Sequence, residues 1–256
     1  VQALSVVPRG PWLVACSGGA DSLALAWAAA HVVASARTPL RAVVVDHGLQ
    51  AGSDAVASSV VTTLAGLDVP ATVCRVAVGG RGGPEAAARD ARYAALEAAA
   101  EPGERVLLGH TLDDQAETVL LGLARGSGTR SLAGMPAERG PFVRPLLGLG
   151  REVTAAVCAQ LGLPVWHDPH NAERRFARVR VRDAVLPLLE RELGPGVREA
   201  LARTAALARQ DADALDAIAA SELASNPETL SCTRLAGLSD AVRSRVIRGW
   251  LPARGA

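Results

Sequence analysis

The glycine-rich stretch Ser17-Gly18-Gly19-Ala20-Asp21-Ser22 lies between an apolar run and a helix-like segment. Two glycines let backbone N–H groups approach an anion, and a following helix N-terminus adds its positive dipole. Ser17 and Ser22 supply hydroxyl donors, whereas Asp21 repels phosphate unless a cation lies between them, which suggests Mg²⁺ bound with a nucleotide. The alternative is an ordinary turn, with Asp21 or Ser22 capping the helix. The stretch contains no lysine, which a P-loop of the GxxxxGK[ST] type requires.

Asp46 and His47 end the second apolar run, and they form another candidate site. His47 could contact a phosphate or an adenine, and Asp46 could orient that histidine or a metal ion. The alternative is a plain turn at a strand end, with Ser53 or Asp54 capping the next helix.

The segment from Gly109 to Thr118, GHTLDDQAET, carries three carboxylates beside His110. Asp113 and Glu117 are four residues apart, and Asp114 and Glu117 are three apart, so the carboxylates can share one helical face. Asp114 and Glu117 also have the spacing of a capping box. Carboxylates in one cleft repel each other unless they bind a cation, either a metal ion or an ammonium group. This face is therefore a candidate site for either kind of cation.

Short β-branched runs alternate with Ala/Leu-rich segments, which predicts a parallel sheet covered on both faces. The expected strands are Trp12–Cys16, Ala42–Asp46, Ala71–Val76, Val106–Gly109 and Phe142–Arg144. The expected helices are Ser22–Ala36, Ser53–Leu67, Pro84–Ala100, Asp114–Arg125 and Glu152–Leu161. Ligands of such sheets bind at the carboxyl ends of the strands, where all three candidate segments fall.

From about residue 180 the pattern is helical, and "RVRVR" before it fits a strand or a helix start equally well. Five arginines between Arg174 and Arg182 form a dense basic cluster suited to an RNA backbone, the alternative being a solvated helix start. Arg125, in Arg125-Gly126-Ser127-Gly128, offers further charge and flexible backbone for phosphate or RNA.

The composition favours a soluble, cytoplasmic protein. All 27 basic residues are arginine, so every cationic phosphate contact must come from arginine, histidine or a metal ion. The four cysteines are far apart, which argues against a zinc ribbon, an iron–sulfur site or a disulfide framework. The apolar stretch 23–34 is too short to span a membrane, and no signal-peptide pattern fits the N-terminus.

The loop SGGADS resembles the SGGxDS loop of the N-type ATP pyrophosphatases, the PP-loop family, which split ATP between its α- and β-phosphates without a lysine. Further motifs resemble the tRNA(Ile)-lysidine synthetases of that family, from Val14 to about Leu189: DHGL, EAAARDARYAAL, GHTLDDQAETVLLGLARGSG, RPLL and WHDPHNAERRFARVRVRDAVLPLL. His170 and Val179 depart from the family's pattern, which has serine and asparagine there.

This resemblance implies an ATP-dependent carbon–nitrogen ligase. ATP would adenylate C2 of the wobble cytidine in an isoleucine tRNA with a CAU anticodon, and free L-lysine would then displace AMP. It implies ATP binding by Ser17, Gly18, Gly19, Asp21, Ser22, His47 and His110, with Mg²⁺ on Asp21. Asp21, Asp46 and Asp113 would be catalytic, and Asp114 and Glu117 would hold lysine. The tRNA contacts would be Arg89, Arg92, Arg125, Asp168, Asn171, Arg174, Arg175, Arg178 and Arg182.

The expected fold is α/β, with a parallel five-stranded sheet of the adenine nucleotide alpha-hydrolase type in strand order 3-2-1-4-5. The catalytic domain would span residues 1–179 and a smaller all-helical tRNA-binding domain residues 180–256. This chain either lacks the further C-terminal domain of longer members or has been cut before it. Two rival functions are a tRNA thiolase of the same group, which the isolated cysteines disfavour, and a non-catalytic adenine-nucleotide-binding protein. Monomer and homodimer both stay open.

Overall fold

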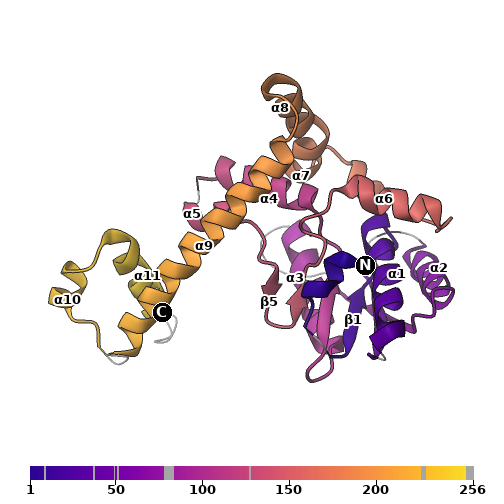
Figure 1. The fold of residues 1–256 in the computed structure, drawn as a ribbon, viewed down its shortest axis with the longest axis horizontal. Coiled ribbons are helices and arrows are strands. Elements are labelled where there is room, and N and C mark those ends of the chain that lie inside the picture. The colour runs from indigo at the N-terminus through magenta and orange to yellow at the C-terminus, as the bar shows by residue number, and fades with distance from the viewer. Residues whose placement is uncertain are drawn as a thin grey trace.

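The computed structural model describes residues 1–8, 10–36, 38–48, 50, 52–77, 84–126, 128–225 and 229–251 (Figure 1). Leu49 of the DHGL motif and Ser127 of the Arg125–Gly128 stretch lie outside the described residues.

A six-stranded sheet forms the base of the fold, with strand order β3-β2-β1-β4-β6-β5. All neighbouring pairs are parallel except β5 and β6. The central strand β1 is buried along most of its length, as expected for a strand covered on both faces. The strands are β1 (Trp12–Ala15), β2 (Leu40–Asp46), β3 (Ala71–Arg75), β4 (Arg105–Leu108), β5 (Glu138–Arg139) and β6 (Phe142–Val143).

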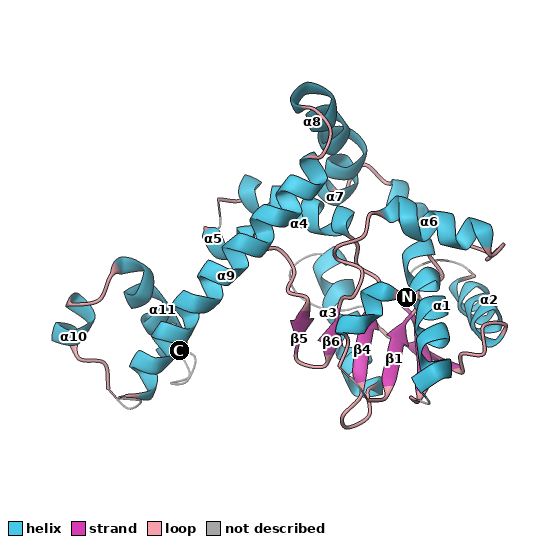
Figure 2. Ribbon diagram, in the orientation of Figure 1, coloured by secondary structure: helices cyan, strands magenta, loops and turns pink. Residues whose placement is uncertain are grey.

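Helices cover both faces of the sheet (Figure 2). On one face, Val14 and Val44 pack with apolar residues of η1 (Gln2–Val6), α1 (Ala20–Ala36), α2 (Ser53–Ala65) and α6 (Arg151–Gln160). On the other face, Leu13 and Val106 pack against Leu96 of α3 (Pro84–Ala99). Successive strand residues therefore point to opposite apolar layers.

The five predicted parallel strands and their order are confirmed, but the sheet has a sixth strand that was not predicted. The extra strand, β5, consists of two exposed charged residues and pairs antiparallel with β6 at the sheet edge. Such a strand carries no apolar alternation, so the sequence pattern could not reveal it. All five predicted helices are present, with ends that differ by up to two residues.

The chain continues as helices: α4 (Leu112–Ala124) and α5 (Thr129–Leu132) follow β4, and after α6 come η2 (Pro169–Ala172), α7 (Ala177–Arg180), a π-helical turn η3 (Val181–Val185), α8 (Leu186–Leu193), α9 (Val197–Ala224), α10 (Cys232–Ala236) and α11 (Asp240–Trp250). "RVRVR" is thus helical. The predicted division after residue 179 falls inside the helical run α7–η3–α8.

The 28-residue helix α9 runs from beside α4 to α10 and α11 (Figure 1). Near the sheet, Ala116 of α4 packs with Val181 and Leu186, and Leu201 of α9 lies against them. At the other end, Ala219 packs with Val242 and Val246 of α11. Within the part of the chain that the structure describes, no helix has the length and apolarity needed to cross a membrane.

All four cysteines are free thiols. Cys16 and Cys158 are buried and Cys74 is partly buried, whereas Cys232 is exposed at the start of α10. Burial raises the pKa of the Cys16 and Cys158 thiols.

Candidate active site

The glycine-rich loop connects β1 to α1 and depends on two close backbone approaches. Gly18 has φ +84°, and a Cβ there would lie 2.5 Å from Cγ2 of Val60 in α2. Gly109, just after β4, would place a Cβ 3.1 Å from the backbone of Asp21. Glycine at 109 therefore lets α1 begin against the end of β4, and glycine at 18 lets the loop pass close to α2.

The Ser22 hydroxyl lies inside this loop. Its Oγ donates to the Gly19 carbonyl at 2.9 Å and accepts from the Ser17 backbone N–H at 3.2 Å. Its contact with the Ser17 hydroxyl is 3.3 Å. Ser22 thus shapes the loop around the helix start, and Ser17, with an exposed side chain, is the serine nearer to solvent.

Arg151, the first residue of α6, draws three carboxylates together. Its Nη2 lies 3.1 Å from Asp114 Oδ1 and 3.7 Å from Glu117 Oε1, and its Nε lies 3.6 Å from Asp21 Oδ2. Burial lowers the pKa of Arg151, but Asp114, Glu117 and Asp21 outweigh it, so the pKa is raised. A guanidinium of the chain itself therefore lies between these carboxylates.

Glu117 is the most enclosed member of this cluster. Its side chain is 0% exposed, and among the described residues neither carboxylate oxygen has a hydrogen-bond partner. Arg178 Nε lies 3.6 Å from Oε2. Burial, with the neighbouring Asp114, raises the pKa of Glu117 to about 7, although Arg151 and Arg178 oppose the rise. Glu117 is therefore a buried acid whose charge state changes near neutral pH.

Asp21 shares this environment. Burial raises the pKa of its carboxyl, and Asp114 adds to the rise, while Thr154 and Arg151 oppose it. The Thr154 hydroxyl donates to Asp21 Oδ1. Across the described ranges, no group of three or more His, Cys, Asp or Glu side chains is arranged to hold a metal ion.

Asp114 also stabilises the start of its own helix. Its Oδ2 accepts hydrogen bonds from the Thr111 N–H at 2.9 Å and the Thr111 hydroxyl at 3.1 Å. The capping box of α4 is therefore formed by Thr111 and Asp114, not by Asp114 and Glu117 as the spacing suggested.

Asp113 does not complete the cluster. Its Oδ2 accepts from the Arg151 backbone N–H at 2.8 Å, and its Oδ1 lies 3.2 Å from Arg198 Nε. The prediction that Asp113, Asp114 and Glu117 meet on one face is wrong in this respect, because the third carboxylate at Arg151 is Asp21. Tertiary ion pairs turn Asp113 toward α9, a direction that helical spacing does not specify.

The two predicted nucleotide-binding histidines lie beyond the ends of β2 and β4. In both rings Nδ1 is buried and, within the described chain, has no hydrogen-bond partner. Burial lowers the pKa of His110 to about 3, and Arg92 and Arg144 add to the effect. Burial, with Arg92, also lowers the pKa of His47. Both rings are therefore neutral at pH 7.

Asp46 is engaged in the turn after β2. Its Oδ1 accepts from the Gly48 N–H at 2.9 Å, and Arg75 Nε lies 3.7 Å from its Oδ2. The hydrogen bonds from Gly48 and Ser53 hold the pKa of Asp46 below its ordinary value. These contacts agree with the turn interpretation, and no contact joins Asp46 to the Arg151 cluster among the described residues.

The predicted tRNA segment is ordered internally by hydrogen bonds from its own arginines to its backbone. Arg180 Nη1 donates to the carbonyls of Arg174 and Arg175 at 2.8 Å each, and Arg182 Nη2 donates to the Asn171 carbonyl. Asp168 Oδ1 caps η2 through the His170 N–H and accepts from Gln50 Nε2, both at 2.9 Å.

The five arginines of this segment do not form one surface. Arg174 and Arg175 have exposed side chains, and Arg175 stacks 4.8 Å over the Phe176 ring. Arg178 instead points inward, where it donates to Thr118 Oγ1 at 3.1 Å beside Glu117. The prediction of Arg178 as part of an exposed basic cluster is therefore corrected.

The other predicted tRNA contacts lie on α3 and at the end of α4. Arg89 is exposed and Arg92 partly enclosed, with guanidiniums 5.2 and 5.7 Å from the Tyr93 ring centroid. Arg92 Nε is buried and lacks a hydrogen-bond partner within the described residues. Arg125, exposed, ends α4.

Sequence reasoning missed Arg151 and Thr154, which organise the charge centre. The available signal is weak: Arg151 follows the RPLL motif and Gly150, the N-cap of α6. Both side chains reach the loop after β1 only because α6 packs beside α1.

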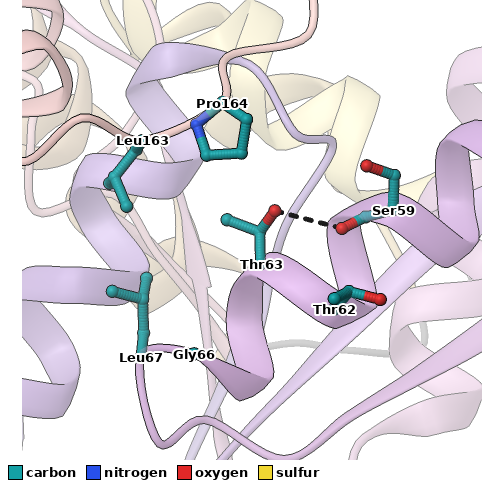
Figure 3. A pocket seen from close by; sticks show the side chains of 7 residues that line it. All are labelled: Ser59, Thr62, Thr63, Gly66, Leu67, Leu163 and Pro164. Carbon is teal, nitrogen blue, oxygen red and sulfur yellow. Dashed lines mark hydrogen bonds between the residues drawn. The ribbon is translucent and has the colours of Figure 1, made fainter.

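A hollow of about 410 Å³ lies elsewhere, between α2 and the chain after α6 (Figure 3). Its walls are hydroxyl-bearing and apolar residues: Ser59, Thr62, Thr63, Gly66, Leu67, Leu163 and Pro164. None of these seven residues is charged, in contrast to the Arg151 cluster.

Several known proteins are similar to this chain in sequence or in fold. Residues 2–189 match the family model of the PP-loop domain. A tRNA(Ile)-lysidine synthase of Mycolicibacterium paratuberculosis is 56% identical over 262 residues, covering 100% of this chain and 80% of that protein. A tRNA(Ile)-lysidine synthase of Thermobifida fusca is 52% identical, covering 96% and 78%.

A solved structure with a similar fold is the U34-tRNA thiolase NcsA from Methanococcus maripaludis with its [4Fe-4S] cluster. It has a TM-score of 0.67 and 18% identity, covering 80% of this chain and 75% of that one. This likeness concerns the fold alone. The much higher identity to the synthases, over nearly the whole sequence, shows that the chain belongs to the tRNA(Ile)-lysidine synthase family of PP-loop proteins.

Proposed function

We propose that this chain ligates free L-lysine to C2 of the wobble cytidine of a CAU-anticodon isoleucine tRNA, in the cytoplasm and at the expense of ATP. The C2 oxygen attacks the α-phosphate of ATP, and the bond to pyrophosphate breaks. The lysine ε-amine then attacks C2, the C2–O bond breaks, AMP leaves and the amine loses a proton. The 56% identity to a tRNA(Ile)-lysidine synthase across the whole chain carries this proposal.

The nucleotide end of the site is the loop Ser17–Gly19 with the N-terminus of α1. Its N–H groups suit phosphate oxygens, and neutral His47 and His110 suit a nucleobase or phosphate. Mg²⁺ fits on Asp21 with the phosphates supplying further ligands, since Mg²⁺ commonly uses one or two carboxylates. When bound, Mg²⁺ neutralises phosphate charge. We propose that Asp46, whose Oδ1 accepts from the Gly48 N–H in the adjoining turn, orients His47.

The amine end is Asp114 with Glu117. We propose that the lysine ammonium groups bind these carboxylates and replace part of their pairing with Arg151 and Arg178. A cation beside Glu117 lowers the pKa of that carboxyl and so keeps it ionised. The attacking amine must be neutral, and the ionised carboxylate of Glu117 beside it is suited to accept its proton.

We propose that residues 1–179 form a catalytic domain and residues 180–256 a helical tRNA-binding domain. The exposed arginines Arg89, Arg125, Arg174 and Arg175 are the proposed phosphate contacts, together with Arg92, Asp168, Asn171 and Arg182. Arg178 contacts Glu117 and would act at the lysine end.

The decisive experiment is incorporation of ¹⁴C-lysine into a CAU-anticodon isoleucine tRNA transcript with ATP and Mg²⁺, against an identical transcript with a GAU anticodon. The proposal expects labelling that depends on ATP and on CAU. Pyrophosphate release that depends on tRNA, without labelling, would retain adenylation and exclude lysine as the nucleophile. ATP binding without turnover would favour the nucleotide-binding rival.

A further inference from the structure

We infer that Asp113 and Arg198 form a positioning relay that fixes Arg151 in the active site and connects the start of α9 to the carboxylate cluster. The inference rests on the proposed function, and it assigns Asp113 a role different from the catalytic one expected from its motif. Neither residue touches a group that reacts in the proposed chemistry, so both act through Arg151.

The first link joins α4 to α6. Asp113 Oδ2 accepts a hydrogen bond of 2.8 Å from the Arg151 backbone N–H at the first residue of α6. That N–H has no partner within its own helix, because a helix leaves its first four N–H groups unpaired. A carboxylate there also favours the positive end of the helix dipole. Asp113 thus fixes the backbone from which the Arg151 guanidinium extends.

The second link joins α4 to α9. Asp113 Oδ1 lies 3.2 Å from Arg198 Nε, and Arg198 Nη1 lies 3.3 Å from Glu190 Oε1. Glu190 accepts backbone N–H bonds from Gly196 at 2.8 Å and Arg198 at 3.1 Å, at the start of α9. Arg198 is therefore clamped between α4 and the turn that begins α9.

The relay residues border a hollow that the three cluster carboxylates do not line. Asp113, Arg151 and Arg198 line a hollow of about 480 Å³, whereas Asp21, Asp114 and Glu117 are not part of its wall. The Asp113 side chain is 15% exposed, so its ion pair is less screened than one at the surface.

Displacement of Arg151 would affect both the phosphate end and the proposed lysine end of the site. Arg151 pairs with Asp21 at the phosphate loop and with Asp114 and Glu117 at the proposed lysine end. A displaced Arg151 would leave carboxylates at both ends without their cation. Loss of the relay should therefore weaken the use of ATP and of lysine together, whereas an effect on folding alone would lower the amount of active enzyme and leave both KM values unchanged.

The test compares Asp113→Ala, Arg198→Ala, Arg198→Lys and the Asp113→Ala/Arg198→Ala double variant, with Arg203→Ala as the control on the exposed side of α9. We expect both alanine variants to raise the KM for lysine and for ATP about fivefold to tenfold, as loss of a coupled pair does. The double variant should be no worse than Asp113→Ala, and Arg198→Lys should recover part of the loss. Arg203→Ala should stay within about twofold of wild type.

Unchanged KM values in the alanine variants, or effects that multiply in the double variant, would overturn the relay. Urea unfolding of the same proteins separates this result from failure of the proposed function. If wild type labels no tRNA, the proposed function fails, but the relay can still be tested by unfolding. The relay requires that Arg198→Ala shifts the urea midpoint less in the Asp113→Ala background than in wild type. Equal movements would reject the relay whatever the enzyme does.

Discussion

Glu117 occupies a position where an ionised carboxylate is costly. Its oxygens contact two guanidiniums at 3.6–3.7 Å but, in the described chain, no hydrogen-bond donor. Burial raises its pKa from 4.5 to about 7, so the folded protein binds that proton more tightly than the unfolded chain. Ionisation of Glu117 therefore lowers the free energy of unfolding. This effect is absent below pH 4.5, grows between pH 4.5 and 7, and is complete above pH 7.

Glu117→Gln should therefore gain stability relative to wild type as the pH rises. The amide cannot ionise, so the difference in unfolding free energy between the two proteins should shift in favour of the variant by up to roughly 3 kcal/mol between pH 5 and pH 8. Urea unfolding at both pH values measures it. Glu97→Gln, on the exposed side of α3, is the matched control and should show no such shift. A pH-independent difference for Glu117→Gln would contradict the assignment.

Asp21 and Glu117 should separate the two half-reactions. Asp21→Asn should abolish pyrophosphate release, because this carboxylate is the proposed Mg²⁺ ligand beside the phosphate loop. Asp114→Ala or Glu117→Ala should retain pyrophosphate release but weaken lysine use by tenfold or more, about 1.4 kcal/mol. Release of ³²P-pyrophosphate and incorporation of ¹⁴C-lysine measure the two steps. If the Glu117 variant loses pyrophosphate release at saturating lysine, this division of roles is wrong.

The sequence placed Asp114 and Glu117 together because their spacing is local, and the structure confirms that they meet. It could not place Arg151, which reaches them from another helix. Nor could it orient Asp113, since the turn toward Arg198 depends on where α9 packs. Residues joined by local periodicity are predictable, whereas those joined by tertiary ion pairs are not.

The segment from η2 to α7 is ordered by hydrogen bonds from arginines to its backbone. Arg180 and Arg182 are used in this way, which leaves Arg174 and Arg175 to face solvent. The basic cluster therefore combines internal scaffolding with a smaller exposed surface.

Arg174→Ala/Arg175→Ala should weaken tRNA binding and make it less dependent on salt. Each lost phosphate contact should reduce the slope of log K against log salt by about 1. Binding measured at several salt concentrations tests this, with Arg105→Ala as a comparison, because Arg105 begins β4 at the end of the sheet opposite the site. An unchanged slope would place the tRNA elsewhere.

The strands, too, can be predicted from the sequence only where they carry a local apolar pattern. The buried parallel strands have apolar runs that identify them, whereas β5 is two charged residues defined by the partner it pairs with. A strand that owes its existence to an edge partner has no pattern of its own.

The helix α9 connects the sheet domain with the distal helices and is held along its length. Asp216 pairs with Arg130 of α5 at 2.6 Å and with Arg245 of α11 at 2.9 Å. The Arg130 side chain is 69% exposed, but that of Arg245 is only 11% exposed.

Arg245→Ala should therefore destabilise the protein more than Arg130→Ala. An exposed ion pair contributes about 0.5 kcal/mol, whereas a buried charged hydrogen bond contributes about 1.5–3 kcal/mol. Thermal unfolding of the two variants measures the order, and Asp216→Asn should resemble Arg245→Ala. If Arg130→Ala lowers the Tm more than Arg245→Ala, the distal helices are not held as this arrangement requires.

Of the four thiols only Cys232 is exposed, so it can carry a fluorescent label in the unmodified chain. Cys16 and Cys158 are buried with raised pKa values, Cys74 is partly covered, and Cys232 is exposed beyond the far end of α9. A maleimide fluorophore should thus attach first at Cys232, without mutagenesis. With a second dye on the tRNA, energy transfer from that position would follow the distal helices as the enzyme engages its substrate.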